Sequence, residues 1–397
     1  MQTIQHYCNR LVQKFDLPPW LFGYRYLPVE HPEDYIKRCA SVDEFKAAFR
    51  IIDPEIVIKN ALPCNIGDPN ALNSQRYGNF PLAFSEVPLL KVGPSWITTI
   101  DDCFILRYRD VWKNDFYAIV SSDKRSIAYP GIGYRPEHAQ SLRRSKECRD
   151  FEKGTWIFGM WYRNYYLWLT SYVPRLMLAV ETGCAEDILF PGGPDLSAHN
   201  IRTIERLRIP MNNIMPYDEV AWHVGQLTLI HDEPYRGSRL REFREIVCGH
   251  SNRPPYRKVF ISREKAQFRR LVNQDEVWPI FKRMGWQKVC MEDMSFDDQI
   301  KLMSETLAFA GVHGGGFGNM IFCPEGAHVF EICREGVMSA SFYALASAMG
   351  HHYWFGKAQI IGNNARPNFD DVEIKPHIIE NILQQIENQL SKNNIHI

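Results

Sequence analysis

A glycine-rich segment behind a short apolar run is the feature that most limits the fold of this chain. The apolar run is Leu307–Val312, and four glycines occur in the five positions 314–318. Such a run is typical of a buried strand, and glycine lets the backbone adopt positive φ and lets a ligand approach closely. A strand that opens through this loop into a helix directs free backbone N–H groups at one point, which suits a phosphate. The segment predicts a site for a phosphorylated small molecule, and a nucleotide-linked one is favoured.

The C-terminal half alternates between short apolar runs and helical patterns. We expect strands at 258–262, 286–291, 307–312, 327–332 and 352–355, and helices at 274–284, from 295 onward, and at 339–349. This alternation predicts a parallel sheet with right-handed crossovers. Ligands of such sheets bind at the carboxyl ends of the strands, where Ser262, His313 and Ile332 fall.

The first half is less regular, and it predicts a second α/β domain of residues 1–245. A Rossmann-like, ligand-binding domain is expected at residues 246–375. Residues 376–397 begin with proline and carry isoleucine and leucine at helical spacing, which predicts a terminal amphipathic helix that packs back on the body.

Bulk composition excludes several protein classes. The 46 basic and 46 acidic residues cancel, which argues against broad nucleic-acid binding. Ten scattered cysteines without a CxxC pair predict free thiols in a reducing compartment. The N-terminus lacks a signal-peptide pattern, and no apolar run reaches the roughly 20 residues of a membrane span. We therefore expect a cytoplasmic protein; a peripheral contact with the inner membrane face and a homodimer are left open.

Arginines follow the first strand of the C-terminal half. Arg263 comes directly after it, and Arg269 and Arg270 lie further along. Guanidinium groups bind phosphate oxygens bidentately and keep their charge. We expect Arg263 and Arg269 to bind the ligand, whereas Arg270 is read as a solvated residue.

The glycine loop supplies further candidates. Gly314, Gly315 and Gly316 would offer their amides to a phosphate, and His313 would contact the phosphate or the reacting group. Asn319 would either cap the following turn or touch the ligand.

Glu331 closes the next expected strand. Its carboxylate would accept two hydrogen bonds from a ribose diol, or would form a surface ion pair.

These residues, in this order, resemble the signature region of glycosyltransferase family 61, which includes plant xylosyltransferases and animal N-acetylglucosaminyltransferases acting on proteins. The resemblance rests on Ser262-Arg263, Arg269, Asn273-Gln274, Gln299-Ile300, the segment His313–Phe322, Pro324-Glu-Gly326 and Glu331, with Asn164–Leu169 and Pro174–Leu176 upstream.

The resemblance implies a GT-B-like α/β fold of two Rossmann-like domains facing a central cleft. The second domain would bind a nucleotide-sugar donor, expected to be UDP-linked, and the first a glycan or lipid-linked glycan acceptor. Inversion at the anomeric carbon is implied, with no cofactor and no essential metal. Asp297-Asp298 is better explained by helix capping than by metal binding.

Two positions depart from the family pattern. Leu167 and Ser171 stand where the family usually carries a histidine and an acidic residue. Neither can act as a general base, so the base is open among His313, Asp195, His199 and Asp232, since histidines and carboxylates can accept a proton.

The resulting prediction is an inverting glycosyltransferase of bacterial surface-polysaccharide biosynthesis. The alternative is a non-catalytic nucleotide-sugar-binding component of a polysaccharide assembly complex, which the changes at Leu167 and Ser171 motivate.

Overall fold

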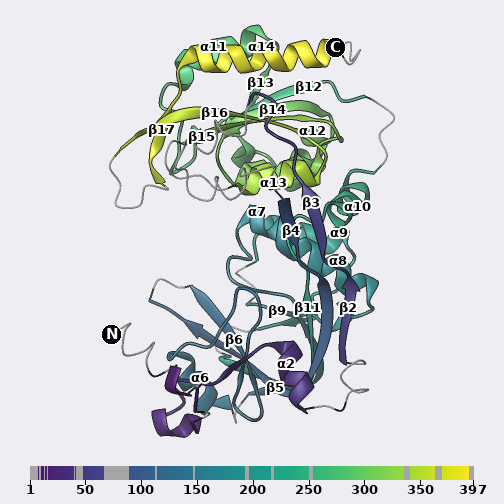
Figure 1. Ribbon diagram of the computed structural model, residues 1–397, viewed down its shortest axis with the longest axis vertical. Helices are drawn as coiled ribbons and strands as arrows, with labels where there is room; N and C mark the ends of the chain where they lie inside the picture. Colours follow the sequence, from purple (N-terminus) through teal and green to yellow (C-terminus); the bar gives the residue numbers. More distant parts are fainter. Residues whose placement is uncertain are drawn as a thin grey trace. The chain divides into compact units, whose positions relative to one another are not determined.

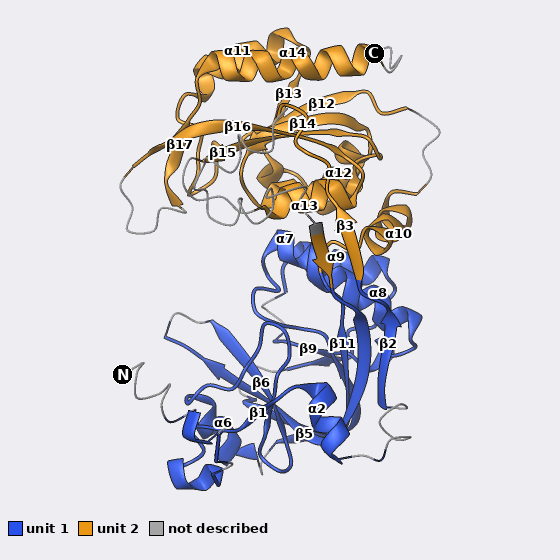
Figure 2. Cartoon of the chain, viewed as in Figure 1, with its two compact units in different colours: residues 1–55, 93–233 blue, residues 56–92, 234–397 orange. Residues whose placement is uncertain are grey.

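The computed structural model describes most of the chain as two compact units. The described residues are 8, 10–12, 14–15, 17–39, 41, 48–66, 89–111, 114–145, 148–192, 196–215, 219–249, 254–334, 340–362 and 369–392. Unit 1 comprises residues 1–55 and 93–233, and unit 2 comprises residues 56–92 and 234–397 (Figure 2). The units thus divide at residue 233, where the sequence predicted a boundary after residue 245, and a stretch of the N-terminal half belongs to unit 2.

Unit 2 is built on a mainly parallel sheet. Its strands lie in the order β13 (Gln287–Val289), β12 (Arg257–Ile261), β14 (Thr306–Val312), β15 (His328–Arg334), β16 (His352–Ile361) and β17 (Asp371–Glu373), and only β17 pairs antiparallel. Numbered by their place in the chain, the first five strands of this order are the second, first, third, fourth and fifth. That is a doubly wound sheet whose topological switch point lies between β12 and β14. The predicted parallel sheet is confirmed.

Helices cover both faces of this sheet (Figure 1). One face carries α11 (Gln274–Arg283) and α14 (Pro376–Lys392), and the other carries α10 (Gly237–Cys248), α12 (Phe296–Ser304), the 3-10 helix η7 (Gly315–Phe322) and α13 (Ser341–Ala348). A second strand pair of unit 2 comprises β3 (Ile56–Lys59) and β4 (Leu89–Val92), and a short 3-10 helix, η6 (Met291–Asp293), precedes α12.

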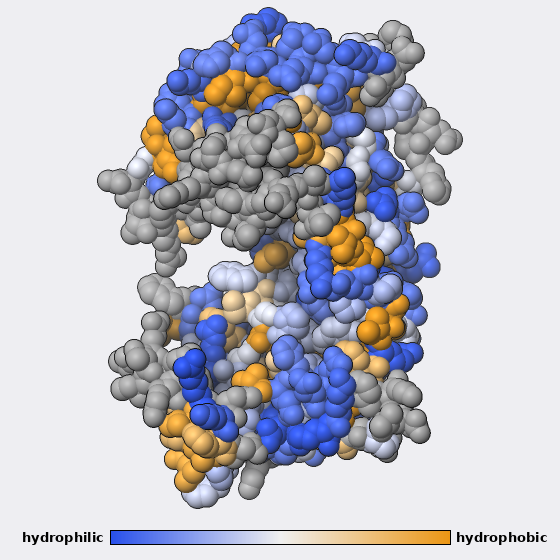
Figure 3. Space-filling model, in the orientation of Figure 1, coloured by the Kyte–Doolittle hydropathy of each residue, from blue (hydrophilic) through white to orange (hydrophobic). Residues whose placement is uncertain are grey.

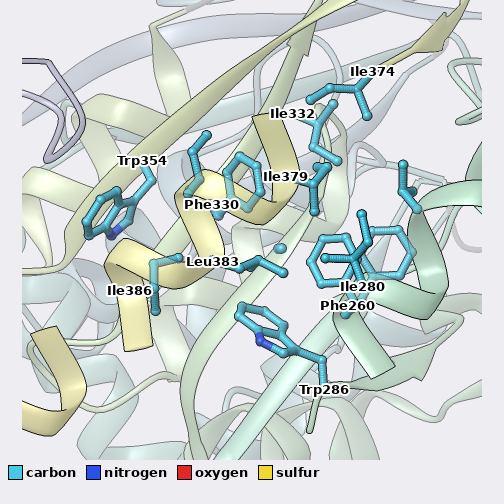
Figure 4. Close-up of a cluster of buried hydrophobic side chains, with 14 of the residues drawn as sticks. Phe260, Ile280, Trp286, Phe330, Ile332, Trp354, Ile374, Ile379, Leu383 and Ile386 are labelled. Atoms are coloured by element: carbon cyan, nitrogen blue, oxygen red, sulfur yellow. The ribbon is translucent and has the colours of Figure 1, made fainter. Parts of the chain in front are cut away.

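The terminal helix α14 shows why the sequence pattern specifies this packing. It begins at Pro376, as predicted, and buries one apolar stripe at helical spacing: Ile379, Ile382, Leu383, Ile386 and Leu390. These side chains join Phe260, Trp286 and Trp354 in one core cluster (Figure 4). The opposite side of the helix is polar, and the visible surface over α11 and α14 is mostly hydrophilic (Figure 3).

Unit 1 departs from the predicted Rossmann-like domain. Its long strand β5 (Ser95–Arg109) pairs antiparallel with β2 (Phe49–Asp53), β6 (Asp115–Ser121) and β11 (Ala221–His231). Only residues 110–114 connect β5 to β6, which is too short for a parallel crossover. Around these strands lie β1 (Val29–Glu30), β7 (Ser126–Ile127), η1 (Pro19–Phe22), α2 (Pro32–Cys39) and α6 (His138–Arg143).

The other side of unit 1 is parallel. Here β11 pairs with β8 (Arg149–Trp156), Thr155 of β8 bridges Ile188, and the adjoining β9 (Leu189–Phe190) pairs with β10 (Asn213–Ile214). The helices α8 (Val173–Glu181) and α9 (Ala198–Arg206) and the 3-10 turn η4 (Ala185–Asp187) provide the connections. Across this half the strands lie in the order β10, β9, β8, β11. By their place in the chain these are the third, second, first and fourth, so a switch point lies between β8 and β11. Unit 1 is therefore half doubly wound and half antiparallel.

No helix among the described residues is long and apolar enough to cross a membrane. All ten cysteines are free thiols, as predicted.

Candidate functional site

The switch point of unit 2 brings Arg263 against the glycine loop. Strands β12 and β14 are hydrogen-bonded neighbours, and their carboxyl ends lead into Ser262-Arg263 and His313-Gly314. A Cβ built on Gly314 would lie 2.2 Å from Nη1 of Arg263, so any larger residue would require the guanidinium to move. The expected positive φ is not found at any of the loop glycines. Their role here is close approach.

The loop opens directly into η7 at Gly315. The first N–H groups of such a helix have no partner within it and attract an anion. A Cβ on Gly315 would meet nothing within 4 Å, so a ligand has access to the backbone there.

Asn319 lies within η7 and connects this helix to α12. It is fully buried, and its Nδ2 donates to Oε1 of Gln299 on α12 at 3.1 Å. A contact between Asn319 and a ligand stays a prediction.

Two half-buried arginine side chains lie at the carboxyl end of β12. Arg263 donates from Nη2 to the Phe268 carbonyl at 2.9 Å and from Nε to the Arg269 carbonyl at 3.1 Å. Burial lowers the pKa of Arg263 to about 10, and the charge of Arg269 adds to the effect. Within the described part of the chain, no carboxylate forms an ion pair with Arg263. A partly buried cation without a counter-ion is costly, so the site favours an anion.

Arg269 strengthens this positive region. Its backbone adopts φ 58°, in the left-handed region that few non-glycine residues occupy. Burial lowers the pKa of its guanidinium, and its Nε is buried with no hydrogen-bond partner among the described residues. Arg270, in contrast, is exposed and donates from Nε and Nη2 to Oδ2 of Asp371, at 3.1 and 2.7 Å, which fits the surface role expected of it.

A third guanidinium, that of Arg334, was not predicted from the sequence. It ends β15 and is almost fully buried. Burial, and then the charge of Arg269, lower its pKa. The predicted strand stopped at residue 332, and the two further residues of β15 were the signal that could have revealed Arg334.

His313 is held by a buried carboxylate. Its Nδ1 lies 2.5 Å from Oε1 of Glu331, and the Tyr353 hydroxyl donates to Oε2 of Glu331 at 2.6 Å. Glu331 is fully buried, so both oxygens are occupied inside the unit. Glu331 thus lies in the interior and not in a surface ion pair, and its predicted contact with a ribose diol stays a prediction.

The pairing with Glu331 determines the role of the second ring nitrogen of His313, Nε2. A carboxylate beside Nδ1 holds the proton there and leaves Nε2 as the lone-pair nitrogen. The His313 side chain is 19% exposed, and Nε2 has no partner within the described residues. Such a histidine can accept a proton from a substrate.

The remaining candidate bases belong to unit 1. His199 lies on α9, where burial lowers its pKa to about 4 and its ring packs edge-on against Tyr165. Asp232 follows β11, is fully buried and accepts a hydrogen bond from Ser95 Oγ at 2.7 Å. Asp195 lies outside the described residues.

The two positions that depart from the family pattern lie in one helical segment. It comprises α7 (Tyr165–Leu167), a π-helical turn (Trp168–Tyr172) and α8. Leu167 is half-buried and Ser171 is buried. Pro174 has no N–H to donate; the wider π turn just before it accommodates this, and the segment continues as a helix.

Across the residues that the structure describes, no three His, Cys, Asp or Glu side chains gather as a metal site requires. Independence from a metal stays a prediction.

The part of the chain that contains this site is similar in sequence to known glycosyltransferases. The glycosyltransferase 61 family model matches residues 165–330, from α7 into β15. Similar curated proteins include three EGF domain-specific O-linked N-acetylglucosamine transferases. That of Mus musculus is 30% identical over 103 residues, and that of Bos taurus is 30% identical over 101 residues. That of Gallus gallus is 27% identical over 103 residues. Each match covers 24% of this chain and 19% of the relative. The resemblance to glycosyltransferase family 61 is thereby confirmed over residues 165–330, which include Arg263 and the glycine loop.

Proposed function

We propose that this protein is an inverting glycosyltransferase that moves a sugar from a UDP-linked donor to a hydroxyl of a glycan acceptor. The observation that carries the proposal is the pair of half-buried guanidinium groups, Arg263 and Arg269, beside the accessible backbone of Gly315. Half-buried cations next to free backbone N–H groups suit a diphosphate. The family match supplies the reaction class.

The reaction follows from these positions. The acceptor oxygen attacks the anomeric carbon, and the bond from that carbon to the phosphate oxygen breaks with its electron pair going to the diphosphate. Arg263, Arg269 and the first-turn amides of η7 stabilise the charge that develops there. The proton of the acceptor hydroxyl passes to Nε2 of His313. A single in-line displacement inverts the anomeric configuration.

Two observations favour His313 over the other base candidates. Glu331 orients its ring, and Nε2 is left to accept a proton. His199 would be a weak base, because burial lowers its pKa to about 4.

The wider setting is part of the same proposal. In a GT-B-like arrangement unit 2 would bind the donor and unit 1 the acceptor. The acceptor would be a glycan or lipid-linked glycan, and the work would take place in the bacterial cytoplasm at the inner membrane face during surface-polysaccharide synthesis.

Turnover tests the proposal. The protein is incubated with UDP-, GDP- and CMP-sugars and a panel of oligosaccharide acceptors, with release of the nucleotide measured and product configuration read by NMR. Transfer from a UDP-sugar with inversion is expected. If UDP binds tightly yet no combination turns over, the second candidate stands, a nucleotide-sugar-binding component without catalysis, which Leu167 and Ser171 favour.

A further inference from the structure

A separate pocket lies within unit 1. It has a volume of about 270 Å³ and is lined by residues 114–116, at the start of β6, and by residues 160–164. The second group belongs to the loop that follows the carboxyl end of β8.

Trp161 is the most unusual residue of this pocket. Its side chain is 66% exposed, and its backbone φ is 67°. Exposure of a large aromatic ring and a left-handed backbone at a bulky residue are both unfavourable, and such outliers cluster at functional positions.

The backbone around Trp161 is fixed by its neighbours. Met160 donates its N–H to the Gly131 carbonyl at 2.7 Å and accepts a hydrogen bond from the Tyr172 hydroxyl. The N–H of Asn164 donates to the Trp161 carbonyl at 2.7 Å. A Cβ on Gly159 would lie 2.5 Å from the Pro130 carbonyl oxygen, so the backbone at Gly159 packs directly against that of Pro130. The backbone that carries the exposed indole is therefore held in place.

The lining combines aromatic faces with polar groups. Phe116 and Met160 provide apolar surface beside Trp161, and both contact the guanidinium of Arg135, which lies 3.8 Å from the Phe116 ring centroid. Asn114 and Asn164 add exposed amides.

The lining of the pocket includes one acidic and one basic side chain. Arg163 lies at its rim with its side chain 45% exposed, and its Nη2 lies 3.8 Å from Oδ2 of Asp115. Arg109 binds the same carboxylate bidentately, at 2.7 and 2.5 Å. Together with Arg135 these guanidinium groups outnumber the Asp115 carboxylate, so donors to ligand oxygens are available beside the aromatic surface.

We propose that this pocket binds a pyranose ring of the acceptor glycan, stacked on Trp161. A pyranose has an apolar C–H face that suits the π face of an indole, and a rim of hydroxyls that suits amides and a guanidinium. The volume is close to the lower limit of small-molecule pockets, about 300 Å³, which fits one sugar ring. This inference rests on the proposed transferase function, because it names the substrate that unit 1 receives.

The test is a binding titration with matched tryptophan variants. Cellobiose, maltose, lactose, xylobiose, mannobiose and chitobiose are titrated calorimetrically into the wild type, Trp161→Ala, Trp161→Phe and Trp20→Ala. Trp20 is the control, since it is also in unit 1 and 63% exposed. At least one disaccharide should bind the wild type and Trp20→Ala equally, bind Trp161→Ala about tenfold or more weakly, and bind Trp161→Phe with intermediate affinity.

Three results overturn the proposal. They are no binding of any of these sugars to the wild type, equal binding by Trp161→Ala and Trp20→Ala, or a wild-type dimer that Trp161→Ala alone dissociates in sedimentation. Titration of UDP in the same variants separates this inference from the proposed function. Normal UDP affinity with unaltered sugar binding in Trp161→Ala removes the pocket alone, whereas absence of UDP binding in the wild type removes the donor site.

Discussion

The buried carboxylate of Glu331 determines how His313 can act. Both of its oxygens are engaged, one by the His313 ring and one by the Tyr353 hydroxyl. Burial of an ionised group is tolerated only when it is paired and hydrogen-bonded, and here the pairing also selects the histidine tautomer. The His313–Glu331 pair is therefore the feature on which the assignment of the base depends.

We expect Glu331→Gln to lower kcat by about hundredfold or more, because the amide no longer orients the imidazole or stabilises its protonated form. UDP affinity should stay as in the wild type, since Glu331 is fully buried. Steady-state kinetics and a UDP titration measure the two effects. Glu305→Gln is the control, as Glu305 forms a partly exposed ion pair with Arg257. A Glu331→Gln enzyme with wild-type kcat would exclude His313 as the base.

Some of these side chains could be predicted from sequence and others could not. Arg263 and the glycines follow recognisable strand ends, so their position at one sheet edge was predictable. The role of Glu331 was not, because its partner Tyr353 comes from the next strand, and only the packing of β15 beside β16 shows that the carboxylate is buried.

The 3-10 helix η7 carries the candidate phosphate contacts and depends on interior hydrogen bonds. Asn319 connects it to α12, and Nε2 of His351 donates to the Met320 carbonyl at 2.9 Å. Because 3-10 helices have poorer hydrogen-bond geometry than α-helices, these lateral contacts matter for holding the helix start in place.

His351 predicts a pH dependence of stability. Burial lowers its pKa to about 4, below the ordinary value of about 6.5. Between these values the unfolded chain binds a proton that the folded protein does not, so the free energy of unfolding falls as pH falls through this window. We expect His351 to account for about 2 kcal/mol of the loss between pH 7 and pH 5.

Chemical denaturation at both pH values measures this loss. His351→Gln should show a smaller pH dependence than the wild type, while His377→Gln, at an exposed position, should match the wild type. An equal loss in all three proteins would contradict the assignment.

Helices were predicted correctly where the sequence carries a strong local signal such as a capping residue. The Ser295 cap of α12 is present, with the Asp298 N–H donating to Ser295 Oγ at 3.1 Å, which agrees with capping as the role of Asp297-Asp298. The 3-10 form of η7 and the π turn before Pro174 were not predictable, because periodicity does not distinguish these helices from the α form.

The assignment of chain segments to the two units could be read only in part from the sequence. The regular alternation of unit 2 made its sheet predictable, whereas the antiparallel half of unit 1 depends on pairings between distant segments such as β2 and β5. Residues 56–66 belong to unit 2 through contacts that no local pattern signals. The Asn65 amide pairs with the backbone of Phe355, donating to its carbonyl at 2.8 Å and accepting from its N–H at 3.2 Å.

We therefore expect Asn65→Ala to destabilise unit 2 by about 1–3 kcal/mol, because two backbone groups of β16 lose their partner. Urea unfolding monitored by tryptophan fluorescence measures the change. Asn381→Ala, on the exposed side of α14, should leave stability almost unchanged. Equal stability of the two variants would show that the N-terminal segment is dispensable for unit 2.

The donor site is tested most directly by calorimetric titration of UDP into the wild type, Arg263→Ala and Arg270→Ala. Arg270 is the matched control, because it follows the same strand but is paired with Asp371 at the surface. The account predicts that UDP binds the wild type and Arg270→Ala alike and binds Arg263→Ala at least tenfold more weakly. Absence of UDP binding to the wild type, or equal affinity in Arg263→Ala, would contradict it.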